Sequence, residues 1–227
     1  MELYQVDDDY SEAHDVSDSL PKKLREMQDL FWVEAARYNV LPIDDRGAQR
    51  FDVNLRPALN RDTKTFSFYP GTIRVPEGSA PDLKNRSYAI TAETEIPPGG
   101  AEGVLVTQGG RFGGYAFYMQ GGRLHFIYNY LNRDRYPIDS TEPVPSGNAT
   151  LRFEFASDGG VGRGGAGSLF VNGKKVGAGR IEKTVRVRLS LDETFDVGED
   201  TGTPATESYQ VPFKFTGHLK RVQVELK

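Results

Sequence analysis

The sequence contains no cysteine, and among its 227 residues there are only three histidines. The lack of cysteine excludes a disulfide framework, a thiolate nucleophile and a cysteine-based zinc site. The histidines, His14, His125 and His218, lie far apart and match no metal-ligand spacing. We therefore assign them no catalytic or metal-binding role, and we expect His14 to lie in an exposed loop. His125 is expected on a strand, facing away from Leu124 and Phe126.

An excess of positive charge and a long apolar run are also missing. A formal net charge of -4 gives no basic surface of the kind that binds nucleic acid. No apolar run approaches the ~20 residues that span a bilayer, and Met1-Glu2 opens the sequence without the basic and apolar regions of a signal peptide. With 37% hydrophobic and 26% charged residues, the composition is that of a soluble globular protein whose compartment it does not fix.

One amphipathic helix is predicted over residues 20–39. Apolar residues recur there at alternating spacings of four and three, which is the period of one helix face. Asp18 or Ser19 can cap its N-terminus, Pro21 suits its first turn, and Leu41-Pro42 ends it. The apolar stripe comprises Leu20, Leu24, Met27, Phe31, Ala35 and Tyr38.

The first six residues, Met1–Val6, read as a β-strand that precedes this helix. A lone strand cannot satisfy its backbone hydrogen bonds or bury its faces. We therefore expect residues 1–41 to be a strand-plus-helix remnant of a subdomain whose other strands lie outside this sequence. Residues 42–65 lack either periodicity and are long for a loop within one domain, which predicts a connector. A separate β domain is expected over residues 66–227.

From about residue 66 onward the pattern is that of a β protein. Residues Tyr88–Ile96 alternate between apolar and polar until Pro97-Pro98 stops the strand. Many short strands with glycine-rich turns and no intervening helix predict a mainly β fold, an antiparallel β-sandwich. Further strands are expected at Val104–Val106, Tyr115–Tyr118, Leu124–Tyr128, Leu151–Phe155, Ser168–Val171, Lys175-Val176 and in a final run to Lys227.

The last predicted strand changes the parity of its apolar residues. These residues stand at odd positions up to Leu219 and at even positions from Val222 onward. Because a one-residue shift exchanges the two faces of a strand, we predict a β-bulge near Lys220-Arg221.

Residues Gly160–Gly165 satisfy the pattern G-x-G-x-x-G. A dinucleotide site requires a helix after that turn, with the pyrophosphate at its N-terminus. Ser168–Val171 follows instead and reads as a strand. The segment is therefore predicted to be a hairpin connection, and no cofactor-binding residue is assigned.

The acidic stretch 192–202 is the candidate for a bound cation. Asp196, Glu199 and Asp200 could bring together the oxygen ligands that calcium prefers. The spacing is not that of an EF-hand, and solvated acidic loops are common, so a plain surface loop is the alternative. We assign no metal site and keep these three residues as calcium candidates.

Five tyrosines occur within residues 115–136. They could line a sugar-binding face, because aromatic platforms suit carbohydrate rings. Aromatic residues are also favoured in strands and fill the cores of sandwiches, and this second interpretation is preferred. The five are Tyr115, Tyr118, Tyr128, Tyr130 and Tyr136.

Two groups of segments carry a resemblance to a known family. Glu2-Leu3-Tyr4, the acidic run after it and Leu20-Pro21-Lys22-Lys23-Leu24 resemble the closing strand and helix of the type I sulfatases. The second half resembles the C-terminal concanavalin/laminin-G-like β-sandwich of long bacterial arylsulfatases. Its matching segments are Asp158–Gly160, Gly162–Gly165, Leu169–Val176, Gly179–Ile181, Thr184, Ser190–Gly198, Asp200–Pro204, Tyr209 and Phe215–Gly217.

The resemblance implies a parent enzyme that hydrolyses sulfate esters with formylglycine and calcium, in the periplasm or outside the cell. Formylglycine arises from Cys or Ser in a Cys/Ser-x-Pro-x-Arg motif. The nearest segment, Ser19-Leu20-Pro21-Lys22-Lys23, has lysine where arginine is required. We therefore assign no catalytic residue. The chain is expected to be an inactive accessory part that partners the parent's catalytic sulfatase domain.

Two other functions stay open. A free-standing glycan-binding module is the alternative, because laminin-G-like sandwiches often bind sugars or protein surfaces. A structural interaction domain, which binds neither glycan nor calcium, is the third.

Overall fold

The computed structural model describes residues 1–43, 45–47, 49 and 63–227. The chain divides into two compact units, Met1–Pro57 and Ala58–Lys227. Most of the connector predicted over residues 42–65 lies outside the described residues, so its boundaries stay a prediction.

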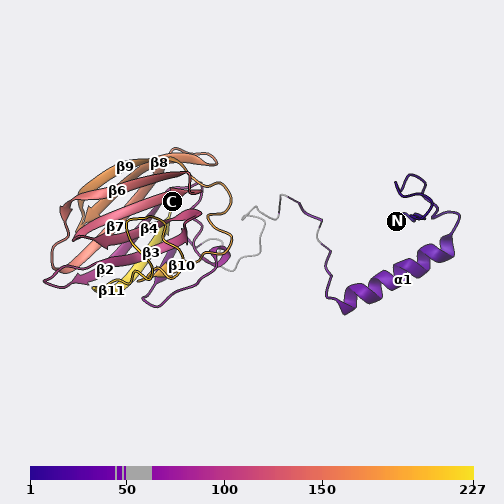
Figure 1. Ribbon diagram of the computed structural model, residues 1–227, viewed down its shortest axis with the longest axis horizontal. Coiled ribbons are helices and arrows are strands. Elements are labelled where there is room, and N and C mark those ends of the chain that lie inside the picture. The colour runs from indigo at the N-terminus through magenta and orange to yellow at the C-terminus, as the bar shows by residue number, and fades with distance from the viewer. Residues whose placement is uncertain (44, 48, 50–62) are drawn as a thin grey trace. The chain divides into compact units, whose positions relative to one another are not determined.

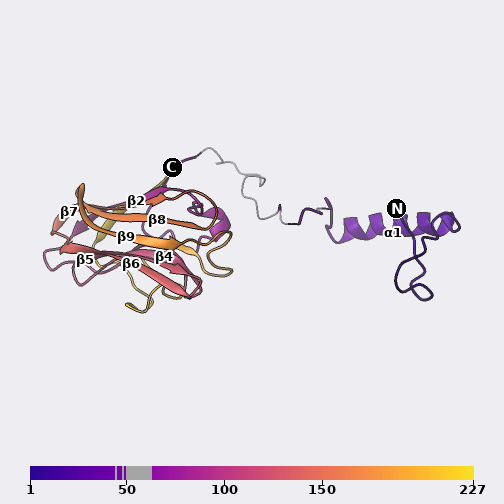
Figure 2. The same cartoon turned by 90° about the horizontal axis from the view of Figure 1, so that it is seen from above.

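The described residues from 63 onward form two antiparallel sheets, which confirms the predicted mainly β sandwich. Figure 2 shows them as two layers, with β2, β7 and β8 in one and β4, β5 and β6 in the other. The six-stranded sheet has the order β1 (Thr65–Phe68), β11 (His218–Leu226), β2 (Tyr88–Ile96), β7 (Gly147–Ser157), β8 (Arg163–Val171) and β9 (Lys174–Lys183). The five-stranded sheet has the order β10 (Phe195–Val197), β3 (Gly103–Gly110), β4 (Gly113–Gln120), β5 (Arg123–Tyr130) and β6 (Asp134–Pro143).

The main core lies between the two sheets. Strand β2 has the bounds predicted from its alternation, and Tyr88, Ile90, Ala92 and Ile96 face this core. The rings of Phe126 on β5 and Phe153 on β7 stack across the interface, with centroids 3.5 Å apart and planes 6° apart. Both rings are fully buried. The two sheets are therefore joined at their centre by aromatic contact.

The predicted β-bulge is present where the apolar residues of the last strand change from odd to even positions. The register between β11 and β2 shifts between Leu219 and Arg221. The bulge keeps Leu219 buried together with Val222 and Val224. Residues 160–165 likewise belong to a hairpin, because β7 pairs with β8 from Ser157 opposite Gly165 onward.

The strand predicted at Met1–Val6 is wrong, because the first described strand is β1. The backbone N–H of Leu3 donates to the Asp15 carboxylate at 3.0 Å, and its carbonyl accepts from Val16 at 2.8 Å. An extended segment needs a neighbouring strand to satisfy its backbone. Residues 1–43 contain no strand, and these hydrogen bonds within the N-terminal loop satisfy the backbone of Leu3 instead.

The predicted helix is confirmed as α1 (Pro21–Arg37), shown in Figure 1. Pro21 occupies its first turn as expected, but neither Asp18 nor Ser19 caps it. Leu20 takes the N-cap position without a side-chain hydrogen bond, and the Ser19 hydroxyl donates to the Val16 carbonyl instead. Among the described residues, no helix has the length and apolar character needed to cross a bilayer.

We predict that Phe153→Ala lowers the free energy of unfolding by about 3–5 kcal/mol, because it opens a cavity between the sheets. Urea denaturation followed by circular dichroism measures this change. As a control, Phe112→Ala removes an exposed ring and should change stability by less than about 0.5 kcal/mol. Equal losses for the two variants would contradict the central role of the Phe126–Phe153 stack.

Candidate functional site

A hollow of about 390 Å³ lies at one end of the sandwich. Its size is within the range of about 300–1,000 Å³ that is usual for small-ligand sites. Three segments line it: Phe112 in the β3–β4 turn, Leu131 in the β5–β6 turn, and residues 188–192 after β9. Antiparallel pairing of β3 with β4 and of β4 with β5 brings the two turns to the same end of the sheet.

Asn129 fastens these two turns together. Its side chain is fully buried, and its Nδ2 donates to the carbonyls of Gly110 and Arg111, both at 2.8 Å. Its Oδ1 accepts from the backbone N–H of Asn132 at 3.0 Å. A buried amide with all of these bonds made holds both turns in one arrangement.

The third wall packs directly against the β3–β4 turn at a glycine. Gly113 has φ +152°, and a Cβ at this position would overlap the carbonyl oxygen of Leu189. The close approach therefore requires glycine. It places the segment that contains Leu189 beside the ring of Phe112, which lines the same hollow.

A buried ion pair anchors the third wall from the interior. Glu77 accepts the backbone N–H groups of Leu189 at 3.0 Å and Ser190 at 3.2 Å. Lys84 Nζ lies 2.8 Å from the Glu77 carboxylate, and both side chains are largely buried. Glu77, itself paired with Lys84, therefore holds the segment after β9 through these two backbone hydrogen bonds.

The rigid frame leaves large apolar side chains exposed. Phe112 is 66% exposed, Leu131 43% and Leu191 82%. Leu131 also has φ +54°, a left-handed conformation that costs a non-glycine residue of order 1–3 kcal/mol. Of these three residues only Leu131 has this conformation, and sparsely populated backbone conformations occur often at ligand-binding sites.

Polar groups flank this apolar surface. The Arg188 side chain is half exposed, with its Nε donating to the Ser190 carbonyl at 2.8 Å and one terminal nitrogen donating to the Leu191 carbonyl at 3.3 Å. Asp192 is exposed and accepts from the Ser190 hydroxyl at 3.3 Å. The hollow thus combines an aromatic ring, a fixed guanidinium and a carboxylate, a set that can bind both an apolar face and hydroxyl groups.

The tyrosines do not form an exposed platform, and the preferred core interpretation is confirmed for the three that are buried. Tyr115 and Tyr128 lie in the core between the sheets, whereas Tyr118 lies in a smaller cluster on the outer face of the five-stranded sheet. That cluster is closed by Tyr209 and Phe213 from the segment after β10. The other two, Tyr130 and Tyr136, are half-buried.

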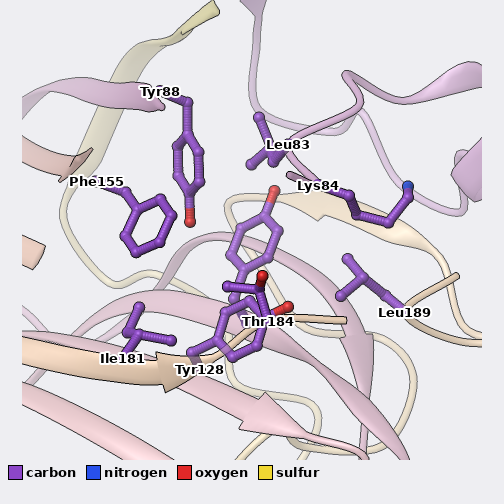
Figure 3. Close-up of a pocket in the computed structure, with 9 residues that line it drawn as sticks. Leu83, Lys84, Tyr88, Tyr128, Phe155, Ile181, Thr184 and Leu189 are labelled. Carbon is purple, nitrogen blue, oxygen red and sulfur yellow. The ribbon is translucent and has the colours of Figure 1, made fainter. Parts of the chain in front are cut away.

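A small internal cavity lies among the buried tyrosines (Figure 3). The side chains of Tyr88 and Tyr128 line it, with Lys84 and Leu83 at one side. Its volume of about 10 Å³ is near the minimum for a single water molecule, so it cannot hold an organic ligand. The Tyr115 hydroxyl also belongs to this cavity and has no hydrogen-bond partner among the described residues.

Two histidines lie as predicted. His14 is exposed in the N-terminal loop. His125 faces away from the buried Leu124 and Phe126: its Nδ1 lies 2.7 Å from Asp139, and its ring stacks on that of Tyr118.

The calcium candidates are engaged in internal hydrogen bonds. The buried Asp196 accepts from the backbone N–H of Arg74 at 2.6 Å and from the hydroxyl of Thr201 at 2.6 Å. The buried Asp200 accepts from the Tyr209 hydroxyl at 2.8 Å, and Glu199 is half-buried. Within the part of the chain that the structure describes, no three acidic or histidine side chains gather as a metal site. Calcium binding by these residues stays an untested prediction.

We predict opposite outcomes for two tyrosines of the internal cavity. Tyr128→Phe should lower the free energy of unfolding by about 1–3 kcal/mol, because it strands the Val185 N–H that donates to the Tyr128 hydroxyl at 2.8 Å. Tyr115→Phe should leave stability unchanged or raise it, because it removes a hydroxyl that has no described partner. Urea denaturation measures both, and an equal loss in the two variants would refute this assignment.

We also predict that Asp200→Asn stabilises the fold at neutral pH. Burial, with smaller contributions from Asp196 and Glu193, raises the pKa of Asp200 to about 6. Between about pH 4 and 6 the Asp200 carboxyl is ionised in the unfolded chain but still protonated in the folded one. The folded state of the wild type therefore loses stability as the pH rises through this range. The variant should therefore gain up to about 3 kcal/mol at pH 8 and nothing below about pH 4.

Thermal unfolding across this pH range checks the Asp200 prediction. The exposed Asp192→Asn is the matched control and should show little change at any pH. A stability difference for Asp200→Asn that does not vary with pH would count against a raised pKa of this buried carboxyl in the folded state.

No protein-family model and no curated protein matches the sequence. The CBM40 module of the Ruminococcus gnavus IT-sialidase, bound to α2,3-sialyllactose, is similar at 15% identity over 70% of this chain and 91% of that chain, with a TM-score of 0.44. Mouse laminin α1 domains LG4–5 are similar at 12% identity over 72% of this chain and 39% of that chain, with a TM-score of 0.42. Sheep galectin-11 is similar at 13% identity over 63% and 99%, with a TM-score of 0.35.

These likenesses are too low to carry an argument about the ligand or the family of this chain. The resemblance to the arylsulfatases therefore stays a prediction from the sequence.

Proposed function

We propose that the β-sandwich is a carbohydrate-binding module whose site is the hollow formed by Phe112, Leu131 and residues 188–192. The observation that carries the proposal is the exposed ring of Phe112 on a fixed turn, next to Arg188 and Asp192 in the same hollow.

The chemistry of this hollow matches that of a sugar. A sugar ring has an apolar face of C–H groups and an edge of hydroxyl groups. The Phe112 ring offers an apolar surface for the face, and Leu131 and Leu191 extend it. Arg188 donates and Asp192 accepts hydrogen bonds, so together they can pair with hydroxyl groups at the edge.

The rigidity of the site also favours binding. Asn129 holds the two turns, and Glu77 holds the segment after β9. Because these walls are already ordered in the free protein, a ligand does not have to order them on binding. A shallow site with few polar groups can then reach a useful affinity.

We predict that Phe112→Ala weakens glycan binding by at least about tenfold, which corresponds to about 1.4 kcal/mol. A glycan array probed with the full chain identifies the ligand, and isothermal titration measures the affinity. Tyr69→Ala is the matched control, because this tyrosine is 59% exposed and does not line the hollow.

Two outcomes would contradict the proposal. One is the absence of any glycan ligand on the array. The other is a glycan ligand whose affinity is unchanged in Phe112→Ala but reduced in Tyr69→Ala.

A second candidate is an accessory part of an arylsulfatase, with formylglycine and calcium in the parent's catalytic domain. It is supported by the sequence resemblance, whose matching segments include Ser190 and Asp192 of the hollow. In this case the chain alone has no sulfatase activity. Turnover of an aryl sulfate by the chain would refute that division of roles, and an in-frame Cys/Ser-x-Pro-x-Arg motif upstream in the gene would support the parent.

A further inference from the structure

We infer that the ligand of the hollow is an anionic glycan, bearing carboxylate or sulfate groups; this inference rests on the proposed function. Its basis is the arrangement of arginines around the hollow. Arg188 lines it, Arg111 directly precedes Phe112, and Arg133 follows the turn that contains Leu131. All three are exposed.

Three of the four arginines on the strands of the six-stranded sheet, by contrast, are paired with acidic residues. Arg152 pairs with Glu154 and Glu225, Arg180 with Asp158, and Arg221 with Glu93. These ion pairs satisfy the guanidinium groups within the protein.

The arginines beside the hollow lack such partners. Among the described residues, neither Arg111 nor Arg133 has an ion pair or a side-chain hydrogen bond. Arg188 donates only to backbone carbonyls, and the acidic group that it approaches is Glu77, at 3.9 Å. Glu77 is already engaged by Lys84 and by backbone N–H groups. The guanidinium charge around the hollow is therefore largely uncompensated.

Further unpaired cations lie at the same end of the sandwich. Arg163 begins β8 opposite Lys183 at the end of β9, and Arg186 follows β9. None of these three has a described ion pair, and all are exposed. Arg163 does lie near an acidic group, because the pKa of Asp158 is lowered by Arg180 and, to a smaller degree, by Arg163. The acidic residues closest in sequence to the lining are Asp192, which lines the hollow, Glu193, which accepts a hydrogen bond from the Thr203 hydroxyl, and Asp134. Exposed basic residues thus gather at this end of the sandwich in a chain whose net charge is -4.

This arrangement selects for the charge of the ligand. A guanidinium presents a planar fork of donors that matches the geometry of an oxyanion, and it is less strongly hydrated than an ammonium group. Several unpaired guanidinium groups around one apolar hollow attract an anion and repel a cation. If a sugar ring lies on Phe112, a carboxylate or sulfate attached to that ring comes close to the guanidinium groups around the hollow.

The test uses dextran, carboxymethyl dextran and dextran sulfate of equal length, which share one backbone and differ in charge. The full chain is expected to bind the two charged polymers at least tenfold more tightly than dextran, with affinity falling as salt is raised. Phe112→Ala should weaken this binding as well.

The double variant Arg111→Gln/Arg133→Gln should weaken binding of dextran sulfate by at least tenfold and reduce its dependence on salt. Lys214→Gln/Lys220→Gln removes the same charge at the opposite end of the sandwich, where β11 begins, and should change affinity by less than twofold. Equal losses in the two double variants would show that only the overall charge matters, and would overturn the inference.

The outcomes separate this inference from the proposed function. If a neutral glycan from the array binds through Phe112 and the charged dextrans bind no better than dextran, the module is confirmed and the anionic ligand is wrong. If no glycan of any charge binds, both are wrong.

Discussion

The two sheets must cover each other's apolar faces, and the rest of the structure follows from this contact. The stack of Phe126 on Phe153 marks its centre. Once the strands are fixed, the turns that join them are fixed too. Asn129, buried on β5, then holds two turns through three hydrogen bonds, and Glu77 holds the segment after β9. The exposed hollow thus takes its shape from buried residues, and its apolar side chains stay in place without a ligand.

The parts of the fold that the sequence predicted are those with a strong local pattern. Strand β2 alternates over its whole length, α1 carries a stripe at helical spacing, and the bulge in β11 shows as a change of parity. Strands β1, β6 and β10 are not among the strands that the sequence predicts. Strand β6 is an edge strand rich in polar residues, and β10 is three residues within an acidic stretch, so neither has a clear period. The sequence of Met1–Val6 has the pattern of a strand. A strand forms only where a second strand pairs with it, and the pattern of six residues does not show whether such a strand is present.

The candidate site was less predictable than the fold. The sequence offers the tyrosines as an alternative sugar-binding face and the acidic stretch as a calcium candidate. Tyr115 and Tyr128 lie in the core, as the preferred interpretation predicts, and Asp196 and Asp200 have internal hydrogen-bond partners. Phe112 and Asn129 carry no sequence motif. The one available signal was the run of glycines that brackets Phe112, Gly109-Gly110 and Gly113-Gly114, since paired glycines allow close backbone approach. Which segments approach there depends on contacts distant in sequence, such as that of Gly113 with Leu189.

The most direct test of the account is hydrogen–deuterium exchange of the full chain with and without its best glycan ligand. If the ligand binds in the hollow, exchange should slow in residues 110–113, 131–133 and 186–192, with little change elsewhere. Protection confined to the outer face of the five-stranded sheet, around Tyr118 and Tyr209, would contradict it. So would a glycan that binds without slowing exchange at the end of the sandwich.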